Sequence, residues 1–236
     1  MIVAIMQPYF FPYIGYFQLM RAAEEFILLD DVQYIRHGWV NRNRILKPAE
    51  SWQYIVVPLR AHSHGALIRE MMTNNDKGWR ELIFRQLAHY RKIARHYTGT
   101  IALVEQALSI ESDNLAAINL HSLSVVANYI GIKIPIRLSS SMDFNYAHIT
   151  DPGDWALTIS EQRNASTYIN PYDGKELFDR AAFSEASIKL QFLKPELLPY
   201  SQRRKIFEPA LSIIDVLMFN GRERVKEMLN GEIIDR

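Results

Sequence analysis

The chain has no cysteine among its 236 residues. Disulfides, cysteine-bound zinc, iron–sulfur clusters and thiol catalysis are therefore excluded. Charge of one sign is also not in excess, since 27 basic and 26 acidic residues give a formal net charge of +1. A strongly basic nucleic-acid-binding protein would carry a marked surplus, so we expect no nucleic-acid partner. No apolar run reaches the ~18 residues of a membrane helix, and we expect a cytoplasmic protein without a membrane span.

Glycine-rich phosphate loops are missing as well. The chain has ten glycines, and none of them forms a Walker loop or a Rossmann glycine fingerprint. An HExxH helix and a GxSxG nucleophile elbow are absent too. If the protein binds a phosphate, side chains and a helix N-terminus must hold it.

Apolar runs alternate with helical patterns along the chain. Residues 2–6 and 26–29 read as strands, and the helical pattern of residues 13–23 between them makes a parallel crossover the natural connection. Further strands are expected at 52–57, 133–138, 166–169 and 188–193. Helices are expected at 77–97, 100–108, 112–130, 155–163, 174–180, 210–220 and 222–229. The sequence predicts a single α/β domain over residues 1–236, with a mostly parallel Rossmann-like sheet, a helical insert at 76–131 and C-terminal helices.

Polar residues follow several predicted strands. In open parallel sheets, ligands bind beyond the carboxyl ends of the strands, so these residues are candidates for a substrate site. Strands that simply end where water begins would leave the same pattern. The candidates at these ends are Gln7, Asp30, Asp31, Ser139, Ser140 and Asn170.

The acidic pair Asp30-Asp31 has three interpretations. The pair could hold a divalent cation such as Mg²⁺ together with substrate phosphates. One carboxylate could be a general base with a pKa raised by its neighbour. Either could instead cap the turn after the strand. Because adjacent residues of an extended chain point to opposite faces, we expect one aspartate to face the site.

A basic stretch follows the acidic pair. Residues 36–47 carry four formal positive charges and no negative one. Guanidinium groups bind phosphates and carboxylates in a bidentate manner, asparagine amides add donors, and an indole offers a flat face to a sugar. The stretch predicts binding of an anionic small molecule, such as a nucleotide-linked or phosphorylated sugar; ion pairs with Asp30, Asp31 and Glu50 are the alternative. The binding candidates here are Gln33, just before the stretch, and Arg36, Trp39, Asn41, Arg42, Asn43 and Arg44 within it, with His37 as an acid–base group.

Four segments together resemble the WbqC-like protein family. They are residues 7–17, residues 30–46, Tyr168-Ile169-Asn170-Pro171 with Gly174 and Leu177, and residues 211–221. The resemblance runs almost from end to end of the chain. It implies a place in bacterial O-antigen and lipopolysaccharide gene clusters, and a transferase that moves glycine or another aminoacyl group onto a sugar. It carries over no catalytic residues.

The first strand and helix also resemble HIGH-type nucleotidyltransferases. In those enzymes a His-x-Gly-His motif at this place binds the triphosphate, whereas this chain has Tyr13 and Tyr16 at the two histidine positions. Tyrosine at neutral pH offers no cationic imidazolium to a phosphate. Nucleotidyl transfer is therefore in doubt, and Tyr13 and Tyr16 can equally be core or crevice wall.

We expect, on these grounds, a transferase of bacterial surface-polysaccharide biosynthesis. Asp30, Asp31 and His37 are the catalytic candidates. Gln7, Tyr13, Tyr16 and the basic stretch would bind substrate, with Ser139, Ser140 and Asn170 on the far wall. Two alternatives stay open: a nucleotidyltransferase-like enzyme that activates a sugar phosphate or amino acid, and a non-catalytic carbohydrate-binding protein. The cofactor is open, with Mg²⁺ as the candidate.

Overall fold

The main sheet has six strands and is parallel except at one edge. The structure is a computed structural model that describes residues 1–235. The strands run in the order β5-β2-β1-β6-β7-β8, and β8 pairs antiparallel with β7. This confirms the predicted α/β class with a mostly parallel sheet. The strands are β1 (Ile2–Met6), β2 (Glu25–Leu28), β5 (Ile136–Leu138), β6 (Thr167–Pro171), β7 (Lys189–Pro195) and β8 (Gly231–Ile234).

Both faces of the sheet are buried, which is why its central strands are apolar runs. Along β1, Val3 and Ile5 belong to one hydrophobic cluster while Ala4 belongs to the other. In β2, Ile27 joins the first cluster, and Phe26 and Leu28 join the second. The two-residue period of a strand thus divides consecutive side chains between two cores.

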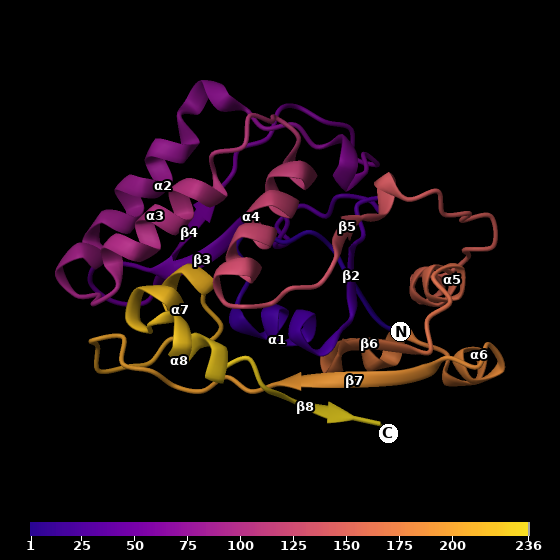
Figure 1. Ribbon diagram of the computed structural model, residues 1–236. Helices are drawn as coiled ribbons and strands as arrows, with labels where there is room; N and C mark the ends of the chain where they lie inside the picture. Colours follow the sequence, from indigo (N-terminus) through magenta and orange to yellow (C-terminus); the bar gives the residue numbers. More distant parts are fainter. Residues whose placement is uncertain (236) are drawn as a thin grey trace.

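Different helices cover the two faces (Figure 1). One face carries α5 (Asp154–Gln162) and α6 (Arg180–Glu185). On the other face lie α1 (Ile14–Ala22) and a larger helical group, which consists of α2 (Trp79–Leu87), α3 (Tyr97–Ala107), α4 (Leu115–Tyr129), α7 (Ile213–Phe219) and α8 (Arg222–Glu227). The connection from β1 through α1 to β2 is the predicted parallel crossover.

The segment between β2 and β5 departs from the expected order in two places. Residues 52–57 do not extend the main sheet, because β4 (Trp52–Val56) pairs with β3 (Arg42–Leu46) in a separate antiparallel hairpin. Residues 42–46 of the basic stretch are therefore strand. The helix expected at 77–97 ends as α2 at Leu87, continues as the 3₁₀ helix η3 (Ala88–Lys92), and is followed by α3 from Tyr97.

The C-terminal third also differs in detail from the prediction. The helix expected at 174–180 is the 3₁₀ helix η5 (Tyr172–Leu177), and the α-helix α6 begins only at Arg180. Asp179 caps α6, since its carboxylate accepts from the backbone N–H groups of Ala181 and Ala182. The edge strand β8 was not predicted, because its four residues are too few to show a pattern.

The strand order places a topological switch point beside β1. From β1 the chain moves to β2 and then β5 on one side, and it returns to β6 on the other. The crevice of a doubly wound sheet opens where neighbouring connections leave in opposite directions, which here is beyond Met6 of β1 and Pro171 of β6.

Candidate functional site

A cavity of about 410 Å³ opens at the switch point. Its walls come from four parts of the chain: the loop from β1 to α1, the β3 hairpin, the end of β6 with η5, and the segment before α7. The lining residues are Met6, Tyr9, Pro12, Tyr13, Trp39, Asn43, Arg44, Pro171, Asp173 and Ala210.

Backbone hydrogen bonds hold the loop after β1 against the β3 region. The N–H of Phe10 donates to the carbonyl of Trp39 at 3.0 Å, and the buried Asn43 amide donates to the carbonyl of Phe10 at 3.1 Å. Phe11 has a φ of +40°, which a bulky L residue adopts only when its surroundings impose it. The wall that carries Tyr9 and Tyr13 is therefore fixed by packing from behind.

Tyr13 lies at the N-cap of α1, directly over Gly15. A Cβ atom added at Gly15 would lie 2.4 Å from the Tyr13 ring, so only glycine leaves room for the ring in this position. Burial raises the pKa of Tyr13, and the charge of Asp173 raises it further. The hydroxyl of Tyr13 is therefore protonated at neutral pH and can donate a hydrogen bond.

Arg44 brings a positive charge to the cavity wall. Its guanidinium lies 5.5 Å from the ring centre of Trp39 and 5.2 Å from that of Trp52. Nη2 donates to the carbonyl of Ala210 at 3.2 Å, while Nε is buried without a hydrogen-bond partner. Among residues 1–235, no carboxylate lies within 4.0 Å of this guanidinium.

The segment before α7 closes the cavity from the C-terminal side. Ala210 has a φ of +52°, which is a strained conformation for alanine. Ser212 connects this segment to β3 and to the loop after β1. Its N–H donates to the carbonyl of Arg44 and its Oγ donates to the carbonyl of Phe11, each at 2.8 Å. The N–H of Ile213 donates to the carbonyl of Pro12. The start of segment 211–221, one of the four that carry the family resemblance, thus packs against the cavity walls.

Asp173 brings a negative charge from the β6 side. Its carboxylate is exposed, and no hydrogen bond or ion pair joins it to another of the described residues. The turn that carries it is fixed by Asn170, which accepts from the Tyr168 hydroxyl at 2.8 Å and donates to the carbonyl of Pro171. A Cβ at Gly174 would lie 2.5 Å from the Asn170 amide nitrogen, so glycine is needed there too. Asn170 therefore supports the wall from beneath.

The acidic pair lies at the ends of β2 and β5, outside the lining of this cavity. Asp30 accepts from Ser139 Oγ, Ser140 N and Ser140 Oγ at 2.6–3.0 Å. Asp31 accepts from Ser139 Oγ, from Tyr146 Oη and from Arg69 Nη1 at 2.7–2.8 Å. Each of the four carboxylate oxygens is thus hydrogen-bonded within the protein.

Both aspartates turn toward the same serine, which corrects the expectation that they face opposite ways. Ser139 Oγ lies 3.0 Å from Asp30 Oδ1 and 2.7 Å from Asp31 Oδ2. The two-sided alternation holds along an extended strand, but β2 ends at Leu28 and the chain bends at the pair. The pair and Ser139-Ser140 together connect the carboxyl ends of β2 and β5.

Three residues of the basic stretch lie away from the cavity. Arg42 lies 4.3 Å from the ring centre of Tyr54 and donates to the carbonyls of Gly38 and His37. His37 is exposed in a turn with a φ of +66°, and Arg36 is exposed beside it. These three residues do not line the cavity.

Four other candidates have structural partners. Asn41 accepts from the Tyr34 hydroxyl and donates to the carbonyl of Val57. The Gln33 amide donates to the carbonyl of His64. The hydroxyl of the buried Tyr16 donates to the carbonyl of Gln7 at 2.9 Å, so both residues support the loop after β1.

Four of the sequence candidates thus meet at the cavity: Tyr13, Trp39, Asn43 and Arg44. Sequence reasoning gave no site role to Asp173 or Ala210, both of which line it. The signal for Asp173 was its position three residues after Asn170, at the end of a predicted strand. No sequence signal marked Ala210, because it contacts Arg44 through its backbone carbonyl.

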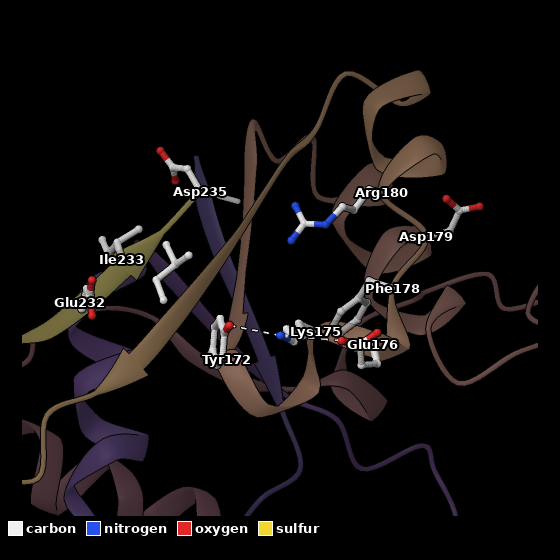
Figure 2. A pocket seen from close by; sticks show the side chains of 10 residues that line it. Tyr172, Lys175, Glu176, Phe178, Asp179, Arg180, Glu232, Ile233 and Asp235 are labelled. Atoms are coloured by element: carbon white, nitrogen blue, oxygen red, sulfur yellow. Dashed lines mark hydrogen bonds and ion pairs between the residues drawn. The ribbon is translucent and has the colours of Figure 1, made fainter.

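A second, wider hollow of about 1020 Å³ lies at the far edge of the sheet, between η5, α6 and β8 (Figure 2). Its rim mixes two basic side chains with four acidic ones. Lys175 already contacts the Tyr172 hydroxyl at 3.1 Å and Glu176 at 3.8 Å, and Asp235 accepts from Lys189 and Gln191. Lys175 and Asp235 of this rim therefore have partners within the protein, whereas Arg44 and Asp173 of the switch-point cavity form no ion pair.

Two kinds of feature are absent from residues 1–235. The helices there are all too short or too polar to span a lipid bilayer. Within the same range, no three side chains of histidine, aspartate or glutamate gather in a way that could hold a metal ion.

Comparison with known proteins gives a family and one relative. Residues 7–227 match the WbqC-like protein family. The chain is 32% identical over 229 residues to the uncharacterized protein Rv1507c of Mycobacterium tuberculosis (strain ATCC 25618 / H37Rv), and the match covers 94% of both chains. No solved structure matches the chain. The match over nearly its whole length shows that the chain belongs to the WbqC-like protein family.

Proposed function

We propose that this protein is a cytoplasmic transferase of bacterial surface-polysaccharide biosynthesis. It moves a small acyl or aminoacyl group onto a sugar, and the reacting molecules meet in the switch-point cavity. Family membership supports the setting. The position of the cavity, beyond the carboxyl ends of β1 and β6, supports the site.

The single observation that carries the proposal is the incomplete coordination of Arg44. A buried guanidinium N–H without a partner is costly, and native proteins satisfy most such groups. Arg44 leaves Nε unpartnered and has no carboxylate nearby. A phosphate or carboxylate of the substrate would complete its hydrogen bonds in the bidentate geometry that guanidinium groups favour.

The remaining walls suit a sugar. Tyr9, Tyr13 and Trp39 contribute aromatic surface, and neither tyrosine hydroxyl has a hydrogen-bond partner among residues 1–235. An aromatic face packs against the C–H face of a sugar ring, while the free hydroxyls can bind its oxygens. A protein that only binds carbohydrate would share these walls.

Asp173 is the basic group of the cavity. An amine or hydroxyl of the acceptor attacks the acyl carbon of an activated donor, and the proton of that attacking group passes to the Asp173 carboxylate. The bond between the acyl carbon and the leaving group breaks, and the leaving group takes its electrons. In this scheme Asp30 and Asp31 fix the neighbouring strand ends, because their oxygens are already occupied.

The test is the mass of the surface polysaccharide made in a producing strain. Deletion of the gene is expected to remove one acyl or aminoacyl substituent, and wild-type protein is expected to restore it. Arg44→Gln should fail to restore it. Arg91→Gln, which changes an exposed arginine of η3, is the matched control and should restore it. An unchanged polysaccharide mass in the deletion strain would overturn the proposal.

A further inference from the structure

The cavity holds one positive and one negative side chain that do not pair. Arg44 comes from β3 and Asp173 from η5, and both line the cavity. No ion pair joins them to each other or to another charged side chain among residues 1–235. The exposed carboxylate of Asp173 differs in this from the buried carboxylate of Glu25, which meets Arg163 at 2.9 Å.

Opposite charges in one small hollow attract each other, more strongly than in bulk water. Here the packing holds them apart. Two indole rings and the Ala210 carbonyl hold Arg44, and the turn built on Asn170 and Gly174 holds Asp173. The cavity is therefore polarised from one wall to the other without a ligand.

We propose that the cavity binds a small zwitterionic substrate, with its carboxylate or phosphate at Arg44 and its primary ammonium at Asp173. This rests on the proposed function and adds the substrate class. A ligand with both charges satisfies both walls at once, whereas a simple anion leaves Asp173 unpaired beside it. Tyr13 lines the same cavity, and its hydroxyl has no hydrogen-bond partner among residues 1–235, so it can bind an oxygen of the same ligand.

Two kinds of metabolite carry this chemistry: α-amino acids and phosphorylated amino sugars. The test therefore uses two matched pairs of probes, in which only the amine is replaced by a hydroxyl. Glycine is compared with glycolate, and glucosamine 6-phosphate with glucose 6-phosphate. The pair that shows the preference identifies the source of the ligand, because the two anions differ in size and in distance from the amine.

Calorimetric titration of the full chain is the measurement. In at least one pair, the amine is expected to bind the wild-type protein about 2–5-fold more tightly than its hydroxyl analogue, the range of one exposed charge pair. Asp173→Asn should abolish this preference and keep binding of the hydroxyl analogue. Arg44→Gln should weaken both members of the pair. The exposed Asp143→Asn is the matched control and should keep the wild-type preference.

The outcomes separate this inference from the proposed function. If both members of each pair bind the wild type equally and Arg44→Gln weakens both, the anion site stands and the zwitterion is wrong. A preference that survives Asp173→Asn would also overturn the inference. If no probe binds at millimolar concentration, the cavity is not the substrate site, and both proposals fall.

Discussion

The side-chain amide of Asn119 donates to the carbonyl of Pro8 at 2.7 Å, from a fully buried position on α4. The same nitrogen donates to the carbonyl of Val40 at 2.8 Å. Pro8 precedes Tyr9, and Val40 follows Trp39, so one amide on the helical face connects the backs of two cavity walls. The family-like loop after β1 is thus attached to a helix more than a hundred residues away.

Replacing Asn119 with alanine should therefore destabilise the protein. Two buried carbonyls would lose their donor, and the expected loss in the free energy of unfolding is about 3 kcal/mol. Urea unfolding of Asn119→Ala measures it. Asn128→Ala, an exposed position of the same helix, should change the free energy by less than about 0.5 kcal/mol. Equal stability of the two variants would contradict a connecting role for Asn119.

Stability should also depend on pH through Asp215, a buried aspartate of α7. Its carboxylate accepts from the hydroxyls of Tyr90 and Tyr200 at 2.5 and 2.6 Å and from the Gln202 amide at 3.0 Å. Burial raises the pKa of Asp215 to about 6, although these hydrogen bonds act in the opposite direction. The folded protein therefore binds this proton more tightly than the unfolded chain does.

The contribution of Asp215 to stability is full below pH 4 and is lost as the pH rises through 6. Its size between these limits is about 3 kcal/mol. Because other carboxylates titrate too, the quantity to measure is the difference in unfolding free energy between the wild type and Asp215→Asn at pH 4.5 and pH 7.5. The wild type should lose stability relative to the variant on going to pH 7.5. A difference that does not change with pH would contradict the raised pKa.

Part of the site could be predicted from the sequence because the information is local. An apolar run that ends at Gln7, followed by a helix, fixes the end of β1, and the strand-end rule then selects the neighbouring polar and aromatic residues. Tyr13 was found in this way. The composition of the basic stretch pointed to Arg44 and Trp39, since three arginines and no acid within residues 36–47 suit an anion.

The rest depends on contacts between distant segments. Asp173 lines the cavity only because β6 pairs with β1, some 165 residues away in sequence, and no local pattern specifies that pairing. The saturation of Asp30 by Ser139 and Ser140 likewise arises from β5 lying beside β2. The assembled fold also decides which guanidinium groups keep an unpartnered N–H. Arg42 donates to the carbonyls of Gly38 and His37, whereas the Nε of Arg44 has no partner.

Gly15 should be needed for the position of Tyr13 rather than for stability. In Gly15→Ala the new methyl group displaces the Tyr13 ring, while alanine favours the helix by about 1 kcal/mol. We expect little change in melting temperature and, by calorimetry, weaker binding of whichever amine probe, glycine or glucosamine 6-phosphate, binds the wild type. Gly99→Ala in α3 meets nothing within 4 Å, so it should raise stability and keep binding. Unchanged affinity in Gly15→Ala would remove Tyr13 from the site.

Asp30→Asn distinguishes a structural acidic pair from a catalytic one. The amide cannot accept from both Ser140 N and Ser140 Oγ as the carboxylate does, so the contact between β2 and β5 weakens. The expected loss in the free energy of unfolding is about 2 kcal/mol, the value of hydrogen bonds to a charged group, and urea unfolding measures it. Asp143→Asn serves as the control.

The same Asp30→Asn variant should still restore the polysaccharide substituent at a temperature where it is folded, because its side chain does not line the cavity. A general base would behave in the opposite way, since its removal leaves the fold intact and stops proton transfer. Normal stability together with loss of the substituent would therefore move the chemistry from the switch point to the ends of β2 and β5.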